Sequence, residues 1–215
     1  VTLDAPLTSL PGIGPQRAAL FARLNVRTVG ELLRLYPRTY EDRTRLVSIA
    51  SLEAGTPACF EAAVVTTPRT NRIPKPGSRM LEVTKFTVAD DTGRLNLTFF
   101  NAAHSAGALR VGERYCFYGV LTGDFAAYGM TNPLFEPCDG PAHVTRRILP
   151  VYPLTAGLTN SMVLRAQAQA VSRCAGLLPE TLPPELLRRY GLCGAAEACR
   201  EIHCPTSAAA LGRAQ

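Results

Sequence analysis

The chain has 215 residues, 47% of them hydrophobic and 19% charged, so it can bury a core, and wholesale disorder is excluded. Its formal net charge is +6, and its basic residues are almost all Arg, which suits bidentate contacts with phosphate. The seven Cys are odd in number and scattered, which excludes a disulfide framework, and no apolar run has the roughly 18 residues of a membrane span. These features indicate a soluble, reduced, cytoplasmic protein, with nucleic acid as the first partner to test.

The first 50 residues predict two short helices. A turn rich in Pro and Gly precedes the first helix, and Thr28 with Glu31 forms a capping box at the start of the second. The Gly-x-Gly turn resembles half of a helix-hairpin-helix element, whose backbone N–H groups bind phosphate at a helix start. Gly12, Gly14 and Arg17 are therefore candidates for a phosphate contact. The same turn is equally compatible with packing alone.

Residues 51–142 predict a β domain. The strand-like runs are 58–67, 80–90, 94–101, 114–123 and 125–133. A short helix at 102–109 lies between the third and fourth strands. This order is that of an OB-fold, a small Greek-key barrel. The predicted fold class is therefore α+β, mainly β: a five-stranded OB-fold barrel flanked by an N-terminal helical hairpin and C-terminal helices.

The last part of the chain, residues 143–215, predicts a connector followed by helices. Pro punctuates the connector at 146–159, and helical patterns follow it at 159–178, 183–191 and 195–203. The predicted domain order is thus a helical segment at 1–50, an OB-fold at 51–142, and a connector with C-terminal helices at 143–215.

No catalytic or metal site is predicted. The chain has no GxxxxGK[ST] loop, no HExxH and no GxSxG, and the acidic pair at 90–91 lies in a hairpin turn that favours Asp for structural reasons. One group of possible zinc ligands is Cys193, Cys199, His203 and Cys204. Its spacing is poor for zinc, so packing in the core or on a helix face is the preferred interpretation.

The connection between the first two strands, residues 68–79, is the first candidate for DNA contacts. It carries Arg69, Arg72, Lys75 and Arg79 and no acidic residue. OB-folds commonly use this loop to grip nucleic acid, so we expect these side chains to contact phosphates. The alternative is a solvated loop without a partner.

The stretch LTFFNAAH, residues 97–104, is the second candidate. Successive side chains of a strand point to opposite faces, so Phe99 shares the core stripe with Leu97, while Phe100 stands on the polar face with Thr98. An exposed ring at a barrel edge suits base stacking, and His104 follows nearby. The pattern is equally compatible with Phe100 packing under the N-terminal or C-terminal helices.

Several segments together resemble the N-terminal wedge region of the RecG family of bacterial ATP-dependent DNA helicases. They are LPGIGPQRAALFARLNVRTVGELLRLYPRTYEDR, LEVTKFTVADDTGRLNLTFFN, MTNPLFE, ILPVYPLTAGLTN and EACREIHCP. The similarity runs over about residues 8–205, and the PVYPLT-x-GL connector is its most specific part.

The resemblance implies a function that composition does not show. The family's wedge enters the centre of branched DNA, such as stalled forks and Holliday junctions, while two motor domains use ATP and magnesium for fork regression and branch migration. Phe100 matches the aromatic that stacks on a base at the branch point, and His104 takes the place of a second aromatic. Without the motor domains, this chain is expected to need no cofactor and to bind branched DNA as a monomer.

Two other functions are compatible with the residues. The barrel could be a structural scaffold or a protein-interaction module, in which case it would bind no DNA at low salt. It could also be a general single-strand binder, in which case long single strands would bind more tightly than forks.

Overall fold

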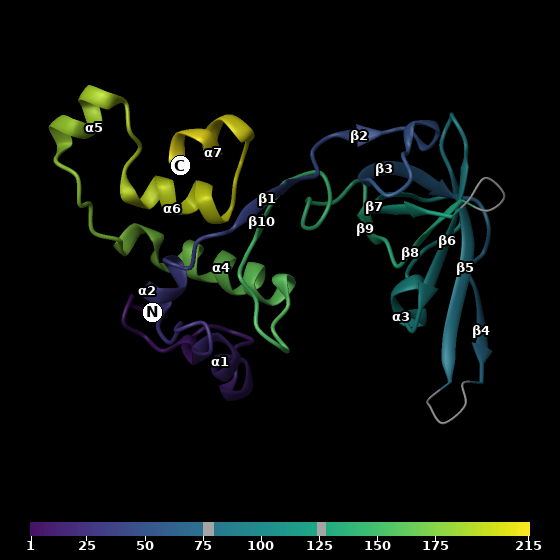
Figure 1. Ribbon diagram of the computed structural model, residues 1–215, viewed down its shortest axis with the longest axis horizontal. Coiled ribbons are helices and arrows are strands. Elements are labelled where there is room, and N and C mark those ends of the chain that lie inside the picture. Colours follow the sequence, from purple (N-terminus) through teal and green to yellow (C-terminus); the bar gives the residue numbers. More distant parts are fainter. Residues whose placement is uncertain (75–79, 124–127) are drawn as a thin grey trace. The chain divides into compact units, whose positions relative to one another are not determined.

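The computed structural model describes residues 1–74, 80–123 and 128–215 (Figure 1). It consists of two compact units. The first, called here the helical unit, comprises Val1–Asp42 and Ile148–Gln215. The second, the barrel unit, comprises Arg43–Arg147. This division differs from the expected three successive segments, 1–50, 51–142 and 143–215. Apolar residues from both chain ends share one core, so the first and last segments fold as a single unit.

The helical unit contains the helices that the sequence predicted and three elements that it did not. The predicted helices are α1 (Pro15–Ala22), α2 (Val29–Leu33), α4 (Asn160–Cys174), α5 (Pro184–Tyr190) and α6 (Ala195–His203). The elements missed are α7 (Ala208–Ala214) and an antiparallel pair, β1 (Thr39–Asp42) with β10 (Ile148–Val151). Short 3-10 turns lie at Leu7–Ser9 and Ala175–Leu177. The stretch predicted as a connector thus includes a strand. The helices in the described residues are all too short or too polar to cross a membrane.

Local capping and buried polar contacts explain how the helical unit is held together. Thr28 and Glu31 form the predicted capping box at α2, and the Thr159 side chain caps α4 by accepting from the Met162 N–H. Gln167, which is fully buried on α4, donates to the carbonyl of Leu32 at 2.7 Å. This bond satisfies a carbonyl at the end of α2 and fixes α4 against it.

His203, at the end of α6, is a core residue with both ring nitrogens occupied. Its Nε2 lies 2.8 Å from the carbonyl of Leu33, which can only accept, so Nε2 donates and Nδ1 accepts from the Tyr152 hydroxyl at 2.8 Å. Burial lowers the pKa of His203 from 6.5 and favours the neutral ring. Cys199 is also buried. Packing is therefore the role that the geometry assigns to this His and Cys pair, rather than ligation of zinc.

The described residues of the barrel unit form eight strands, five of which close a ring. Its strands are β2 (Leu46–Val47), β3 (Pro57–Val64), β4 (Arg69–Ile73), β5 (Leu81–Ala89), β6 (Arg94–Phe100), β7 (Arg114–Thr122), β8 (Gly129–Thr131) and β9 (Leu134–Pro137). A 3-10 turn at Ile49–Ser51 follows β2, and helix α3 (Ala103–Ala106) lies between β6 and β7.

The ring runs β3-β5-β6-β8-β7 and back to β3. Only the β6–β8 pair in it is parallel. In order along the chain, this is strand order 1-2-3-5-4 with a helix after the third strand, which is the OB-fold that the sequence predicted. In Figure 1, β4 and β5 form a long hairpin at one side of the barrel.

Two acidic residues fix loops of the barrel unit. Asp90, in the β5–β6 turn, accepts from the N–H groups of Ile49 at 2.7 Å and Gly93 at 2.9 Å. Burial acts to raise the pKa of Asp90, but these hydrogen bonds outweigh it and hold the pKa below its usual value. The predicted structural role of the acidic turn is confirmed for Asp90.

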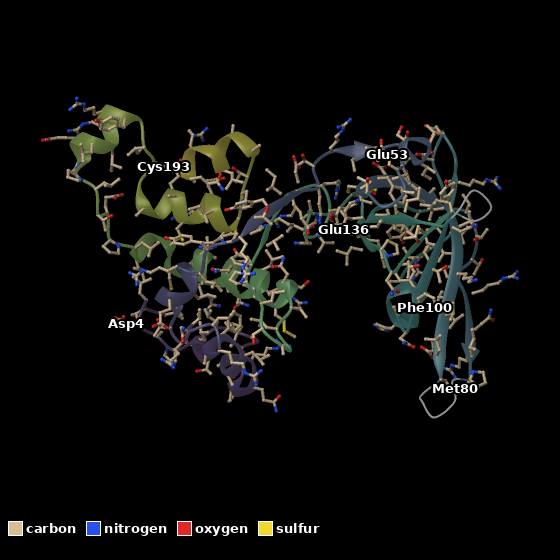
Figure 2. All side chains as sticks on the ribbon, in the orientation of Figure 1. Asp4, Glu53, Met80, Phe100, Glu136 and Cys193 are labelled. Carbon is tan, nitrogen blue, oxygen red and sulfur yellow. The ribbon has the colours of Figure 1, made fainter. Side chains whose placement is uncertain are left out.

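Glu136, on β9, is buried and fixes the segment that follows β9 by accepting hydrogen bonds from its main chain. Glu136 is labelled in Figure 2. Its two oxygens accept from the N–H groups of His143, Val144 and Thr145 at 2.9–3.0 Å, and from the Thr145 hydroxyl. A single carboxylate thereby satisfies three consecutive main-chain donors of a segment without regular secondary structure.

Candidate nucleic-acid interface

Phe99 and Phe100 lie on opposite faces of β6, as the two-residue period of a strand predicted. Phe99 is 3% exposed, and its ring stacks on Phe86 with centroids 5.7 Å apart. Phe100 is 38% exposed at the end of β6, close to α3 (labelled in Figure 2). Phe99 therefore belongs to the barrel core, and Phe100 presents an aromatic ring to solvent.

A groove of about 730 Å³ lies on the same outer face of the barrel. The residues that line it are Thr66, Thr67, Arg69, Lys85, Phe86, Thr87, Asn96, Leu97, Thr98, Thr122, Gly123, Tyr128, Gly129, Met130 and Thr131. Most of the side chains that point outward in it are hydroxyls, amides or cations. Phe100 stands two residues beyond Thr98 on the same face of β6, so its Cα lies about 7 Å beyond that of Thr98 along the strand.

Two cations face each other in the groove. The register of the β4–β5 ladder places Arg69 directly opposite Lys85, and both line the groove. Like charges in this position repel each other. Within the part of the chain that the structure describes, neither side chain has an acidic partner. The pair therefore forms a local excess of positive charge that an anion would neutralise.

Two of the four residues predicted to contact phosphate lie in the described part of the chain, and their side chains project from opposite faces of one strand. Residues 69–73 form strand β4 rather than a loop, so Arg69 and Arg72 project from opposite faces. Arg72 points away from the groove residue Arg69 and pairs with Glu82, with Nε and Oε1 3.1 Å apart. Lys75 and Arg79 lie outside the described residues. Of the two described side chains, Arg69 lines the groove.

Lys85 is the groove residue that the sequence interpretation missed. Its strand, β5, alternates buried and outward positions around it, with Phe86 inward and Thr87 outward. A cation on the outer face of the second barrel strand could have been found from that alternation.

The other predicted residues have defined positions, but no contact tests their roles. His104 is exposed on α3, four residues beyond Phe100. Gly12 has φ of 79°, and Gly14 precedes α1 as its N-cap. Arg17 Nη1 donates to the Gly12 carbonyl at 2.6 Å, so this guanidinium closes the turn. Gly12, Gly14 and Arg17 belong to the helical unit, not to the barrel.

A thiol cluster on the barrel was also missed. Cys116 on β7 and Cys138 beyond β9 have their sulfur atoms 3.2 Å apart, and the carboxylate of Glu61 is close enough for all three to surround one ion. Glu61 already accepts from Arg114 Nε at 2.7 Å. Burial and the neighbouring thiol raise the pKa of Cys138, which favours the thiol over the metal-binding thiolate. The arrangement is best explained as a hydrogen-bonded polar network.

Comparison with known proteins gives relatives over nearly all of the chain. Residues 7–173 match the family model of the RecG wedge domain. The ATP-dependent DNA helicase RecG of Escherichia coli K12 is 33% identical over 94% of this chain, and that of Synechocystis sp. is 28% identical over the whole chain. The chain spans 29% and 27% of the lengths of these two relatives.

A solved structure of RecG bound to a three-way DNA junction has the same fold. It aligns with the whole chain at a TM-score of 0.88 and 24% identity, and the chain covers 29% of it. This likeness supports the arrangement of strands and helices described above. Since the family model covers well over half of the sequence, the chain belongs to the RecG family, with its wedge domain at residues 7–173.

Proposed function

We propose that this chain is the branched-DNA-binding wedge of a RecG-type helicase. The observation that carries the proposal is the exposed ring of Phe100 at the end of a polar, cationic groove on the outer face of an OB-fold barrel. The fold and family support the same function, since the relatives are DNA helicases and one of them was solved on a three-way junction.

In this proposal each part of the surface has a separate task. The groove holds one strand near the branch, with Arg69 and Lys85 against its phosphates. Phe100 stacks on a base at the branch point, and His104 assists from α3. Gly12, Gly14 and Arg17 are secondary candidates for a phosphate contact. Fork regression and branch migration would require ATP, magnesium and the motor domains of the whole protein, acting in the cytoplasm.

A general single-strand binder is the second candidate, because the groove alone would suit a single strand. The two proposals differ in what Phe100 does. A ring at the end of the groove adds binding energy at a branch, where an unpaired or terminal base is available for stacking. A single-strand binder would instead gain affinity with strand length.

The test is fluorescence anisotropy of the 215-residue chain with a model fork, a plain duplex and a single strand of matched length. The expected result is that the fork binds more tightly than the duplex and the single strand, with every affinity falling as salt rises. Equal affinity for all three substrates would contradict the wedge function. Tighter binding of the single strand would favour the second candidate.

Replacing Lys85 with Gln is expected to weaken DNA binding without destabilising the barrel. Loss of one phosphate contact lowers the slope of log affinity against log salt by about 0.7–0.9. Removal of one charge from the facing pair Arg69 and Lys85 relieves a repulsion of about 0.2–1 kcal/mol. The measurements are fork anisotropy over a salt series and thermal unfolding of the same variant.

Arg72→Gln is the matched control for that variant. Arg72 lies on the same hairpin but on the other face, and it is already paired with Glu82. Its loss is expected to change the salt slope by less than half as much. A Lys85→Gln variant with the wild-type slope would exclude the groove pair as a phosphate contact.

A further inference from the structure

Two asparagines hold the backbone around Phe100. Asn132 forms its bonds on the β8 side of β6, and Asn101, the residue after Phe100, forms its bonds on the β5 side. On the β8 side, the Phe100 N–H donates to Asn132 Oδ1 at 2.8 Å, and the Asn132 N–H donates to the Thr98 carbonyl at 2.8 Å. In a regular parallel ladder, the main-chain carbonyl of residue 132 would accept the first of these bonds. Asn132 has φ of 46°, and the chain continues into Pro133. The side-chain oxygen therefore replaces the carbonyl at the point where the main chain leaves the ladder.

The β5 side repeats the same arrangement. The Asn101 N–H donates to the Glu82 carbonyl at 2.8 Å, and the Glu82 N–H donates to Asn101 Oδ1 at 3.2 Å. In a regular antiparallel pair, the second acceptor would be the main-chain carbonyl of Asn101. Asn101 has φ of 50°, so here too the amide oxygen completes a ladder that the main chain has left.

Asn has both properties that these positions need. A positive φ is costly for most side chains but is tolerated by Asn, Asp and Gly. Gly allows the turn but has no side-chain acceptor. An acceptor is needed because the ladder N–H of the facing residue would otherwise lose its partner. The presence of Asn directly after β6 and directly after β8 therefore has a common physical explanation.

We propose that Asn132 and Asn101 are positioning residues for Phe100. They complete the pairing on both sides of β6 up to its last residue, so that the exposed ring projects from a fixed backbone at the end of the groove face. Without their side-chain oxygens the strand end frays and the ring samples several directions. The proposal rests on the proposed stacking role of Phe100, and it assigns the asparagines no contact with DNA.

Glycine variants test the side-chain oxygens without disturbing the turns. Asn132→Gly and Asn101→Gly keep the positive φ and remove the acceptor. Asn25→Gly is the matched control, because Asn25 also has a positive φ, of 58°, but is exposed in the helical unit. Asn132→Asp restores an acceptor oxygen and serves as the conservative rescue.

Two readouts separate positioning from general stability. The first is the fluorescence of 2-aminopurine at the branch point of a model fork, which responds to what stacks on that base. The second is hydrogen exchange of the Phe100 amide in the free protein, followed by NMR. Asn132→Gly removes the acceptor of this amide and is expected to speed its exchange about fivefold, while amides of core strands keep wild-type rates.

The expected result is that Asn132→Gly and Asn101→Gly lose at least half of the 2-aminopurine change that wild type gives. Asn25→Gly retains it, and Asn132→Asp recovers it at saturating protein. Suppose that both glycine variants give the full 2-aminopurine change, that the Phe100 amide still exchanges as slowly as in wild type, and that Phe100→Ala loses the 2-aminopurine change. The positioning role is then wrong and the stacking role stands. If Phe100→Ala itself keeps the full change, the stacking role and the inference fall together.

Discussion

Phe100→Ala is expected to weaken fork binding by about fivefold or more while leaving the barrel folded. Base–aromatic stacking contributes roughly 1–3 kcal/mol per base, and this variant removes the ring that would supply it. Phe100 is 38% exposed and lies outside the apolar core cluster of the barrel, so the substitution is expected to cost less than about 1 kcal/mol of stability. The measurements are anisotropy with fork and duplex, and thermal unfolding.

The neighbouring phenylalanine is the internal control for this experiment. Phe99 is 3% exposed and packs against Phe86 and Phe135, so Phe99→Ala is expected to cost about 3–5 kcal/mol of stability. Phe100→Tyr keeps the ring and is expected to keep the preference for the fork. A large loss of stability in Phe100→Ala would show that Phe100 supports the core. An unchanged fork preference in Phe100→Ala would exclude it as the branch-point contact.

The barrel could be predicted from the sequence because its strands alternate clearly between faces. On β6, Leu95 and Leu97 are buried and Asn96 between them is outward, so the same pattern separated Phe99 from Phe100. Strand order with a helix after the third strand then indicated the OB-fold. Local periodicity carries this information because each strand has one face in the core and one in solvent.

The parts that could not be predicted depend on partners far away in the sequence or on strands without alternation. All five residues of β4 are exposed, so its sequence does not alternate between apolar and polar residues. A strand that places Arg69 and Arg72 on opposite faces could therefore not be predicted. The β1–β10 pair joins Asp42 to Ile148, and its second strand contains Pro150, which favours a loop in any local analysis. The core shared by the two chain ends could not be predicted for the same reason, since no local pattern shows which helices pack together.

The candidate site was predicted in its aromatic part and only partly in its charges. Phe100 was identified because it breaks a polar face. Lys85 was missed because a single cation on a strand looks like an ordinary solvated residue until the ladder places it opposite Arg69. Asn132 and Asn101, in contrast, could not be found in advance, since their roles depend on φ and on pairing across strands.

Glu136→Ala is expected to destabilise the barrel unit by about 3 kcal/mol or more. Glu136 is 7% exposed, and its carboxylate accepts hydrogen bonds from three consecutive main-chain N–H groups and one hydroxyl. Hydrogen bonds to a charged acceptor contribute about 1.5–3 kcal/mol each, and buried donors left without a partner add a desolvation cost. Far-UV circular dichroism is a suitable probe of chemical unfolding because the chain contains no Trp. Glu53→Ala, at an exposed carboxylate of the same unit, is the control.

The pH dependence of a second variant, Glu136→Gln, gives a sharper test. Burial acts to raise the pKa of Glu136, but the bonds from Thr145, His143 and Val144 outweigh it and lower the pKa below 4.5. Since the folded state holds the proton less tightly than the unfolded state, this stabilisation is complete above about pH 4.5 and is lost as the pH falls through the folded pKa. The penalty of Glu136→Gln, which cannot ionise, should therefore be largest at neutral pH and shrink in acid. A penalty independent of pH would mean that the charge of Glu136 does not stabilise the segment after β9.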